Sequence, residues 1–269
     1  MTLAFSSVRE ALGAAVTALE AAGCGTPRLD AELLMAEALD VDRSMLAAHP
    51  EMAVPAAAAR VIGERVRRRV VREPVAYILG SKGFRHIDLM VDGRVLIPRA
   101  ETELLVEIAL ELPGGASVHD VGTGSGAVAL AILQERPDLR VSASDASRDA
   151  VDVARANAVR LGLALDLEVR RGLPPRPVDL VVANLPYVTD AEMGSLPPEI
   201  RLHEPREALQ GGPDGLDPIR ELVAQAPSGT RLALEHAPDQ AEAVRRLLAG
   251  AASRRDLAGR ERVTVGTAR

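Results

Sequence analysis

The first seventy residues carry apolar side chains at helical spacing. One stripe follows the capping-box pair Ser7 and Glu10 and contains Val8, Leu12, Ala15, Val16 and Leu19. Thr26-Pro27 opens a second helix, a short helical turn follows Asp42, and Pro55 opens the last. Because proline cannot continue a helix, Glu73-Pro74 ends this part, and residues 1–73 are predicted to form a small helical domain.

The last of these predicted helices has one face rich in arginine. Its members are Arg60, Arg65, Arg67, Arg68, Arg69 and Arg72. A run of like charges on a helix face is typical of a solvated surface. A patch that docks a partner is the alternative interpretation.

Short apolar runs follow the helical part. Residues 77–80 and 84–91 have the apolar and aromatic content of strands, and Asp92-Gly93 predicts a hairpin turn into a strand over 94–97. We therefore expect residues 74–97 to form a β-hairpin that links two domains.

From residue 98 onward, strand and helix patterns alternate. Strands are predicted over 118–121, 141–144, 165–169, 180–183, 231–234 and 262–265. Helices are predicted between them, notably over 101–112, 127–135, 146–161 and 239–248. Such alternation favours an α/β domain over 98–269, with a mostly parallel sheet that is covered on both faces and binds ligands at the carboxyl ends of its strands.

Composition narrows the class of protein. Apolar residues make up 47% of the 269-residue chain and aromatic residues only 1%, so the core is built from Ala, Val and Leu. The net charge of −6 argues against affinity through broad phosphate neutralisation. Cys24 is the sole cysteine, the histidines show no metal-ligand spacing, and no metal site is expected. The sequence shows neither a signal peptide nor a long uncharged apolar run, which makes a cytoplasmic location the expectation.

A glycine-rich turn joins a predicted strand to a predicted helix. Residues 120–126 are Asp-Val-Gly-Thr-Gly-Ser-Gly, and glycines there let the backbone pass close to a ligand. The candidate cofactor-binding residues of this turn are Asp120, Gly122, Thr123, Gly124 and Gly126. Asp145 ends the next predicted strand, nineteen residues after Gly126, where an acid suits a ribose with two free hydroxyls.

A second cluster ends the predicted strand over 180–183. It consists of Asn184, Leu185, Pro186 and Tyr187. The Asn184 side-chain oxygen and the Leu185 carbonyl can both accept hydrogen bonds from one –NH₂ group, and Tyr187 can stack on a flat amide or base. Together with the glycine turn and its acids, this cluster is typical of an S-adenosylmethionine (SAM) methyltransferase that modifies a planar nitrogen.

Several ordered segments carry a resemblance to a known family. They are 72–80, Leu-Ile-Pro-Arg-Ala-Glu-Thr-Glu at 96–103, 120–126, 184–187, His-Glu-Pro-Arg-Glu-Ala-Leu at 203–209, Leu-Glu-His at 234–236, and 255–262. The chain resembles the HemK/PrmC family of protein-(glutamine-N5) methyltransferases. This resemblance implies a Rossmann-like SAM-dependent methyltransferase domain with a mostly parallel seven-stranded sheet. It also implies transfer of a methyl group from SAM to the glutamine of the Gly-Gly-Gln motif in class 1 peptide chain release factors.

The resemblance also implies roles for individual residues. The turn at 120–126 cradles the methionine part of SAM, and Asp145 takes the ribose hydroxyls. Asn184, Pro186 and Tyr187 are the expected catalytic residues, with Asn184 also beside the cofactor. The substrate-binding residues are Asn184, Leu185, Pro186 and Tyr187. Arg99, Glu101 and Thr102 are expected to support the site, and the helical domain is expected to dock the release factor.

Two departures from the family pattern keep alternatives open. Leu185 stands where the family usually has proline, and the stretch 168–177 is shortened and lacks the acidic and aromatic residues often found beside the adenine. A nucleic-acid adenine N6-methyltransferase is one alternative, against which the acidic net charge and scarce aromatics argue. A SAM-binding interaction module with impaired catalysis is the other.

Overall fold

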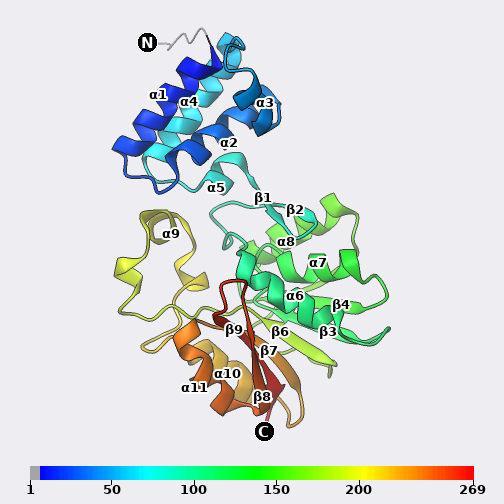
Figure 1. Ribbon diagram of the computed structural model, residues 1–269. Coiled ribbons are helices and arrows are strands. Elements are labelled where there is room, and N and C mark those ends of the chain that lie inside the picture. Colours follow the sequence, from blue (N-terminus) through cyan, green and yellow to red (C-terminus); the bar gives the residue numbers. More distant parts are fainter. Residues whose placement is uncertain (1–6) are drawn as a thin grey trace. The chain divides into compact units, whose positions relative to one another are not determined.

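The computed structural model describes residues 7–269, which divide into two compact units (Figure 1). The first unit contains the described residues up to Gly80 together with Pro197–His203, and the second contains Ser81–Leu196 and Glu204–Arg269. The first unit therefore extends beyond the expected boundary at residue 73 and includes a segment from far along the chain. None of the described helices is both long and apolar enough to cross a bilayer.

The first unit is helical, as its apolar spacing predicts. Its helices are α1 (Val8–Ala21), α2 (Pro27–Leu39), α3 (Arg43–Ala48), α4 (Ala56–Val70), α5 (Val75–Leu79) and α9 (Pro198–His203). The Ser7 hydroxyl caps α1 by accepting from the Glu10 amide at 3.4 Å, and Pro27 occupies the first turn of α2. Apolar residues of α1, α2, α3 and α4 then pack into one core, which includes Val8, Met35, Leu46 and Ile62.

The arginines of α4 are mostly occupied within this unit. Arg69 is 5% exposed, and its guanidinium donates to Asp30 at 2.7 Å and to Glu199 of α9 at 2.8 Å. Arg72 donates to the same Glu199 carboxylate at 2.9 Å. Arg65 pairs with Glu37 and Arg68 with Glu73, while Arg60 and Arg67 are exposed. The solvated-face interpretation is therefore wrong for Arg69, which serves as the buried centre of an ion-pair cluster.

A β-hairpin does lie within residues 74–97, but it is formed by other strands than the predicted ones. Strand β1 (Ser81–Phe84) pairs antiparallel with β2 (Ile87–Met90), with Phe84 opposite Ile87. The predicted strand at 77–80 is helix α5 instead, because the Pro74 carbonyl accepts from the amides of Tyr77 and Ile78. The predicted turn at Asp92-Gly93 does form, since the Asp92 carbonyl accepts from the Val95 amide at 3.1 Å and the Asp92 carboxylate accepts from the Arg94 amide at 3.0 Å. The strand predicted over 94–97 is wrong, because these residues are not paired as a strand.

The second unit is built on a seven-stranded sheet, as the family resemblance implies, with one strand more than the sequence pattern predicts. The strand order is β5-β4-β3-β6-β7-β9-β8. The parallel strands are β3 (Ser117–Val121), β4 (Arg140–Asp145), β5 (Asp166–Val169), β6 (Leu180–Ala183) and β7 (Arg231–Glu235). β9 (Glu261–Thr267) runs antiparallel to β7, and β8 (Ala249–Arg255) runs antiparallel to β9. The mostly parallel α/β class is thus confirmed.

Helices cover both faces of this sheet (Figure 1). One set consists of α6 (Glu103–Leu110), α7 (Ala127–Glu135) and α8 (Arg148–Leu161), and the other of α10 (Asp217–Gln225) and α11 (Ala241–Leu247). Short turns of 3-10 helix lie at η1 (Ala100–Thr102), η2 (Met193–Ser195), η3 (Arg206–Ala208) and η4 (Pro238–Gln240). On the second face, Ile219 and Val244 pack against Val181 and Leu232. The buried sheet fixes the carboxyl ends of β3, β4 and β6 beside one another.

Candidate active site

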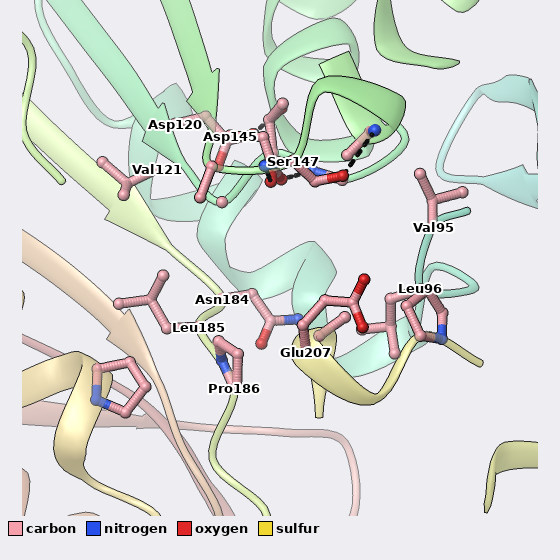
Figure 2. A pocket seen from close by; sticks show the side chains of 18 of the residues that line it. Val95, Leu96, Asp120, Val121, Asp145, Ser147, Asn184, Leu185, Pro186 and Glu207 are labelled. Atoms are coloured by element: carbon pink, nitrogen blue, oxygen red, sulfur yellow. Dashed lines mark hydrogen bonds between the residues drawn. The ribbon is translucent and has the colours of Figure 1, made fainter. Parts of the chain in front are cut away.

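A cavity of about 440 Å³ opens at the carboxyl ends of β3, β4 and β6 (Figure 2). β4 and β5 lie on one side of β3 in the sheet, and β6 and β7 lie on its other side. The direction of the strand order therefore reverses between β3 and β6, and α/β sheets bind ligands at such a switch point. The predicted residues that line it are Asp120, Gly122, Thr123, Gly124, Asp145, Asn184, Leu185 and Pro186. Two other predicted residues, Gly126 and Tyr187, do not line it.

The glycine turn has the backbone conformation that its sequence predicts. Gly122, Gly124 and Gly126 have φ angles of +75°, +56° and +84°, which side chains disfavour. A Cβ at Gly126 would come within 2.9 Å of Leu130. Gly126 therefore serves the close packing of the turn on its own helix, while Gly122 and Gly124 face the cavity.

Two acids lie at the strand ends beside this turn. Asp120 is 2% exposed and accepts a hydrogen bond from the Thr123 hydroxyl at 2.7 Å. Asp145 accepts from the amides of Gly124 and Ser147, both at 2.9 Å. Burial raises the pKa of Asp120 to about 7 and raises the pKa of Asp145 as well, against the opposing effect of its backbone donors. The cavity wall therefore offers carboxyl groups that a cationic ligand would help to ionise.

The second predicted cluster lies across the cavity from the acids (Figure 2). Asn184 follows β6, and its Nδ2 donates to the Thr102 hydroxyl at 3.0 Å. Within the described part of the chain, neither Asn184 Oδ1 nor the Leu185 carbonyl oxygen accepts a hydrogen bond. Two adjacent acceptors thus remain available to a ligand with an –NH₂ group.

A glycine-rich loop holds this cluster from behind. The Gln240 side chain donates to the Tyr187 carbonyl at 2.9 Å and to the Asp214 carbonyl at 3.1 Å. A Cβ at Gly215 would stand 2.2 Å from the Tyr187 carbonyl oxygen, and one at Gly211 would stand 2.7 Å from the Pro186 carbonyl oxygen. The loop can lie this close only because both positions are glycine.

Comparison with known proteins identifies the family. The PrmC N-terminal domain matches residues 10–80, and the methyltransferase small domain matches residues 100–212. A release factor glutamine methyltransferase of Xylella fastidiosa (strain Temecula1) is 43% identical over 256 residues, covering 89% of this chain and 92% of that one. Another, from Caulobacter vibrioides, is 41% identical over 220 residues, covering 79% and 76% of the two chains. The chain belongs to the release factor glutamine methyltransferase family.

The cavity fits the cofactor expected of this family. Asp145 has both carboxylate oxygens fixed by backbone donors and retains lone pairs for ribose hydroxyls. The glycine turn brings main chain to the cavity wall without side chains in the way. Among the described residues, no group of three or more His, Cys, Asp or Glu side chains is arranged to hold a metal ion.

Several lining residues were missed by sequence reasoning. Glu207 comes from the segment 203–209, to which no role was given, and Figure 2 shows its side chain beside Leu96 and the cavity. Arg170 and Arg171 line the cavity from the shortened stretch 168–177, while α10 supplies Glu221. Arg171 pairs with Glu221 at 2.6 Å. This side of the cavity therefore does have an acidic residue, which α10 supplies instead of the stretch 168–177. The motif context at 203–209 and the family position of the stretch 168–177 were the available signals, and neither identified these residues individually.

Proposed function

We propose that this chain transfers a methyl group from SAM to the side-chain nitrogen (N5) of the glutamine in the Gly-Gly-Gln motif of class 1 peptide chain release factors. The observation that carries the proposal is the pair of unused acceptors, Asn184 Oδ1 and the Leu185 carbonyl, across the cavity from the glycine turn. Both hydrogens of a primary carboxamide can bond to such a pair. The names of the relatives support the same substrate.

SAM supplies an activated methyl group, so the chain's own residues need only bind SAM and the glutamine amide and orient them toward each other. The two acceptors hold the amide –NH₂ and thereby aim its nitrogen at the glycine turn. Positioning of this kind can lower a barrier by about 7–11 kcal/mol. Pro186 limits the backbone conformation of the segment. Because Tyr187 does not line the cavity, we assign it a supporting role behind the amide rather than stacking on it.

The Asn184→Ala variant tests this function. We expect methylation of a purified release factor to fall at least a hundredfold, since a lost preorganised hydrogen bond at a reacting group costs about 10²–10³ in rate. The dissociation constant for SAM should change less than threefold. Thr189→Ala is the matched control, because its hydroxyl bonds only to Glu192 nearby. The decisive measurement uses the unchanged chain with SAM bound and maps the masses of the release factor's peptides. The absence of an added methyl group on the Gly-Gly-Gln peptide would refute the proposal.

The two alternatives predict different outcomes of the same assay. Labelled methyl transfer to ribosomal RNA or DNA, and none to the release factor, would favour the adenine N6-methyltransferase. SAM binding without transfer to any of these would favour the interaction module. Neither alternative has support among the relatives, whose names specify a release factor. A translation factor as partner also favours action in the cytoplasm, and the net charge of −6 argues against direct nucleic-acid binding through broad phosphate neutralisation.

A further inference from the structure

One buried asparagine lies behind the glycine turn without lining the cavity. Asn157 belongs to α8 and is 0% exposed. Its Oδ1 accepts from the Met90 amide at 2.7 Å, and its Nδ2 donates to the carbonyls of Met90 at 3.0 Å and of Ser125 at 2.9 Å. The proposed methyl transfer makes no use of this residue.

These partners fix which way the Asn157 side-chain amide points. A backbone amide only donates and a carbonyl oxygen only accepts, so Oδ1 must face the Met90 amide, and the two carbonyls use both Nδ2 hydrogens. Loss of this side chain would leave buried backbone groups unpaired, which is costly. Because Met90 ends β2, Asn157 ties the glycine turn to the end of the hairpin.

The hydrogen bonds of the glycine turn leave one of its amides unused. Four amides of residues 122–126 donate within the chain at 2.9 to 3.0 Å: those of Gly122 and Thr123 to Ser144, that of Gly124 to Asp145, and that of Gly126 to Thr123. In the part of the chain that the structure describes, the Ser125 amide donates to no acceptor. Ser125 lines the cavity, so its amide is the one that the turn keeps for a ligand.

Asn157 restrains the residue that carries this unused amide. The peptide group that joins Ser125 to Gly126 is held at both ends, since its carbonyl accepts from Asn157 and its N–H donates to Thr123. On the other side, Asp145 holds the Gly124 amide. The peptide group between Gly124 and Ser125, which contains the unused N–H, therefore lies between two fixed peptide groups that determine its direction.

We propose that Asn157 is a positioning residue that keeps the Ser125 amide directed at the anionic end of SAM. SAM has one anionic group, its methionine carboxylate, and a backbone N–H just before a helix is a suitable donor to it. Asp120, Asp145 and Glu207 line the same cavity and repel this carboxylate, so a fixed donor decides where it binds. The inference needs SAM as the cofactor but not the release factor as the methyl acceptor.

Binding measurements with two ligands test this role. Decarboxylated SAM lacks the carboxylate but keeps the sulfonium and ammonium groups. By calorimetry, the unchanged chain should bind SAM at least tenfold more tightly than decarboxylated SAM, because a hydrogen bond to a charged group contributes a factor of about ten or more. Asn157→Leu and the smaller change Asn157→Ser, both uncharged, should each reduce this preference to less than threefold.

Val153→Ala is the matched control for a general loss of stability. Val153 is 0% exposed on the same helix, so its truncation also weakens the packing of α8, but it removes no polar group. Its preference for SAM should stay within twofold of that of the unchanged chain, and circular dichroism verifies that each variant is folded. If the Asn157 variants lose affinity for both ligands by the same factor, Asn157 only stabilises the fold and the inference is wrong.

Amide hydrogen exchange observes the proposed donor directly. In the unchanged chain, the Ser125 amide should exchange at least tenfold more slowly with SAM bound than with decarboxylated SAM bound, and Asn157→Ser should abolish the difference. Neither measurement uses a methyl acceptor, so a chain that methylates no release factor would refute the proposed function and still decide this inference. Equal exchange of the Ser125 amide with the two ligands overturns the inference.

Discussion

The buried carboxyl of Asp120 makes cofactor binding depend on pH. Its pKa is raised to about 7 by burial, against the Thr123 hydroxyl, and nearby Asp145 adds to the rise. SAM brings a sulfonium and an ammonium group, and positive charge favours the ionised carboxyl. Below pH 7 binding must therefore expel a proton, at about 1.4 kcal/mol for each pH unit.

We accordingly predict that SAM affinity rises with pH. Between pH 5.5 and 7.5 the dissociation constant should fall by about 25-fold, and Asp120→Asn should reduce that slope. Calorimetry in two buffers of different ionisation enthalpy measures both the affinity and the proton released. Asp179→Asn is a control, because that exposed acid has a pKa lowered by Ser117 and is already ionised in this range. An affinity that stays constant over this range in the unchanged chain contradicts the assignment.

Single residues differ in how well their sequence position reveals their role. Asp145 and Asn184 were identified because each stands at the carboxyl end of a predicted strand, at the edge where ligands bind. Thr102 lies 82 residues before the Asn184 that it holds, and no local pattern links the two. Tyr187 was expected at the amide, but it does not line the cavity. Sequence reasoning finds groups at strand ends more readily than the partners that orient them.

At the scale of elements, the loop at 211–216 supports the segment after β6. Gly215 has a φ of +75°, and a Cβ there would stand 2.2 Å from the Tyr187 carbonyl oxygen and 2.3 Å from Gln240 Nε2. A side chain would thus force apart the hydrogen bond between these groups. The loop and the catalytic segment must move together when either is displaced.

We predict that Gly215→Ala lowers methylation at least tenfold and destabilises the fold by more than conformational strain alone. Gly229→Ala is the matched control, because Gly229 has a similar φ of +87° and open space around its Cβ position. Strain at such a position costs about 1–2 kcal/mol. Chemical denaturation and release factor methylation measure the two effects. Equal losses of stability and activity in both variants would show that the close approach to Tyr187 is unimportant.

The sequence predicted most elements of the sheet but not its last edge. Strand β6 is uniformly apolar, while β3, β4 and β7 carry apolar residues among polar ones, and the positions of all four agree with the predicted ones within a residue or two. β8 has the sequence Ala-Gly-Ala-Ala-Ser-Arg-Arg, which has no strand character of its own. It forms because β9 offers an unpaired edge. Local pattern fails where tertiary pairing decides the conformation.

At the scale of the whole molecule, a distant segment completes the helical unit. Glu199 of α9 is bound by both Arg69 and Arg72, and Asp30 neutralises the other side of Arg69. Residues 127 to 130 positions apart are joined in this cluster. No periodicity in the sequence could predict it, and it removes these arginines from any surface patch.

The remaining docking hypothesis therefore concerns Arg60 and Arg67, which are exposed on α4, and we predict a defined kinetic effect of reversing their charge. A glutamine on a loop offers little surface, so a whole release factor needs contacts elsewhere. Arg60→Glu with Arg67→Glu should raise KM for the whole factor at least fivefold and leave KM for a Gly-Gly-Gln peptide unchanged. Steady-state kinetics at low salt, where exposed charges are least screened, measures both. Arg160→Glu is the control, because Arg160 is an exposed arginine of α8 outside this face, and equal changes for factor and peptide would refute docking at this face.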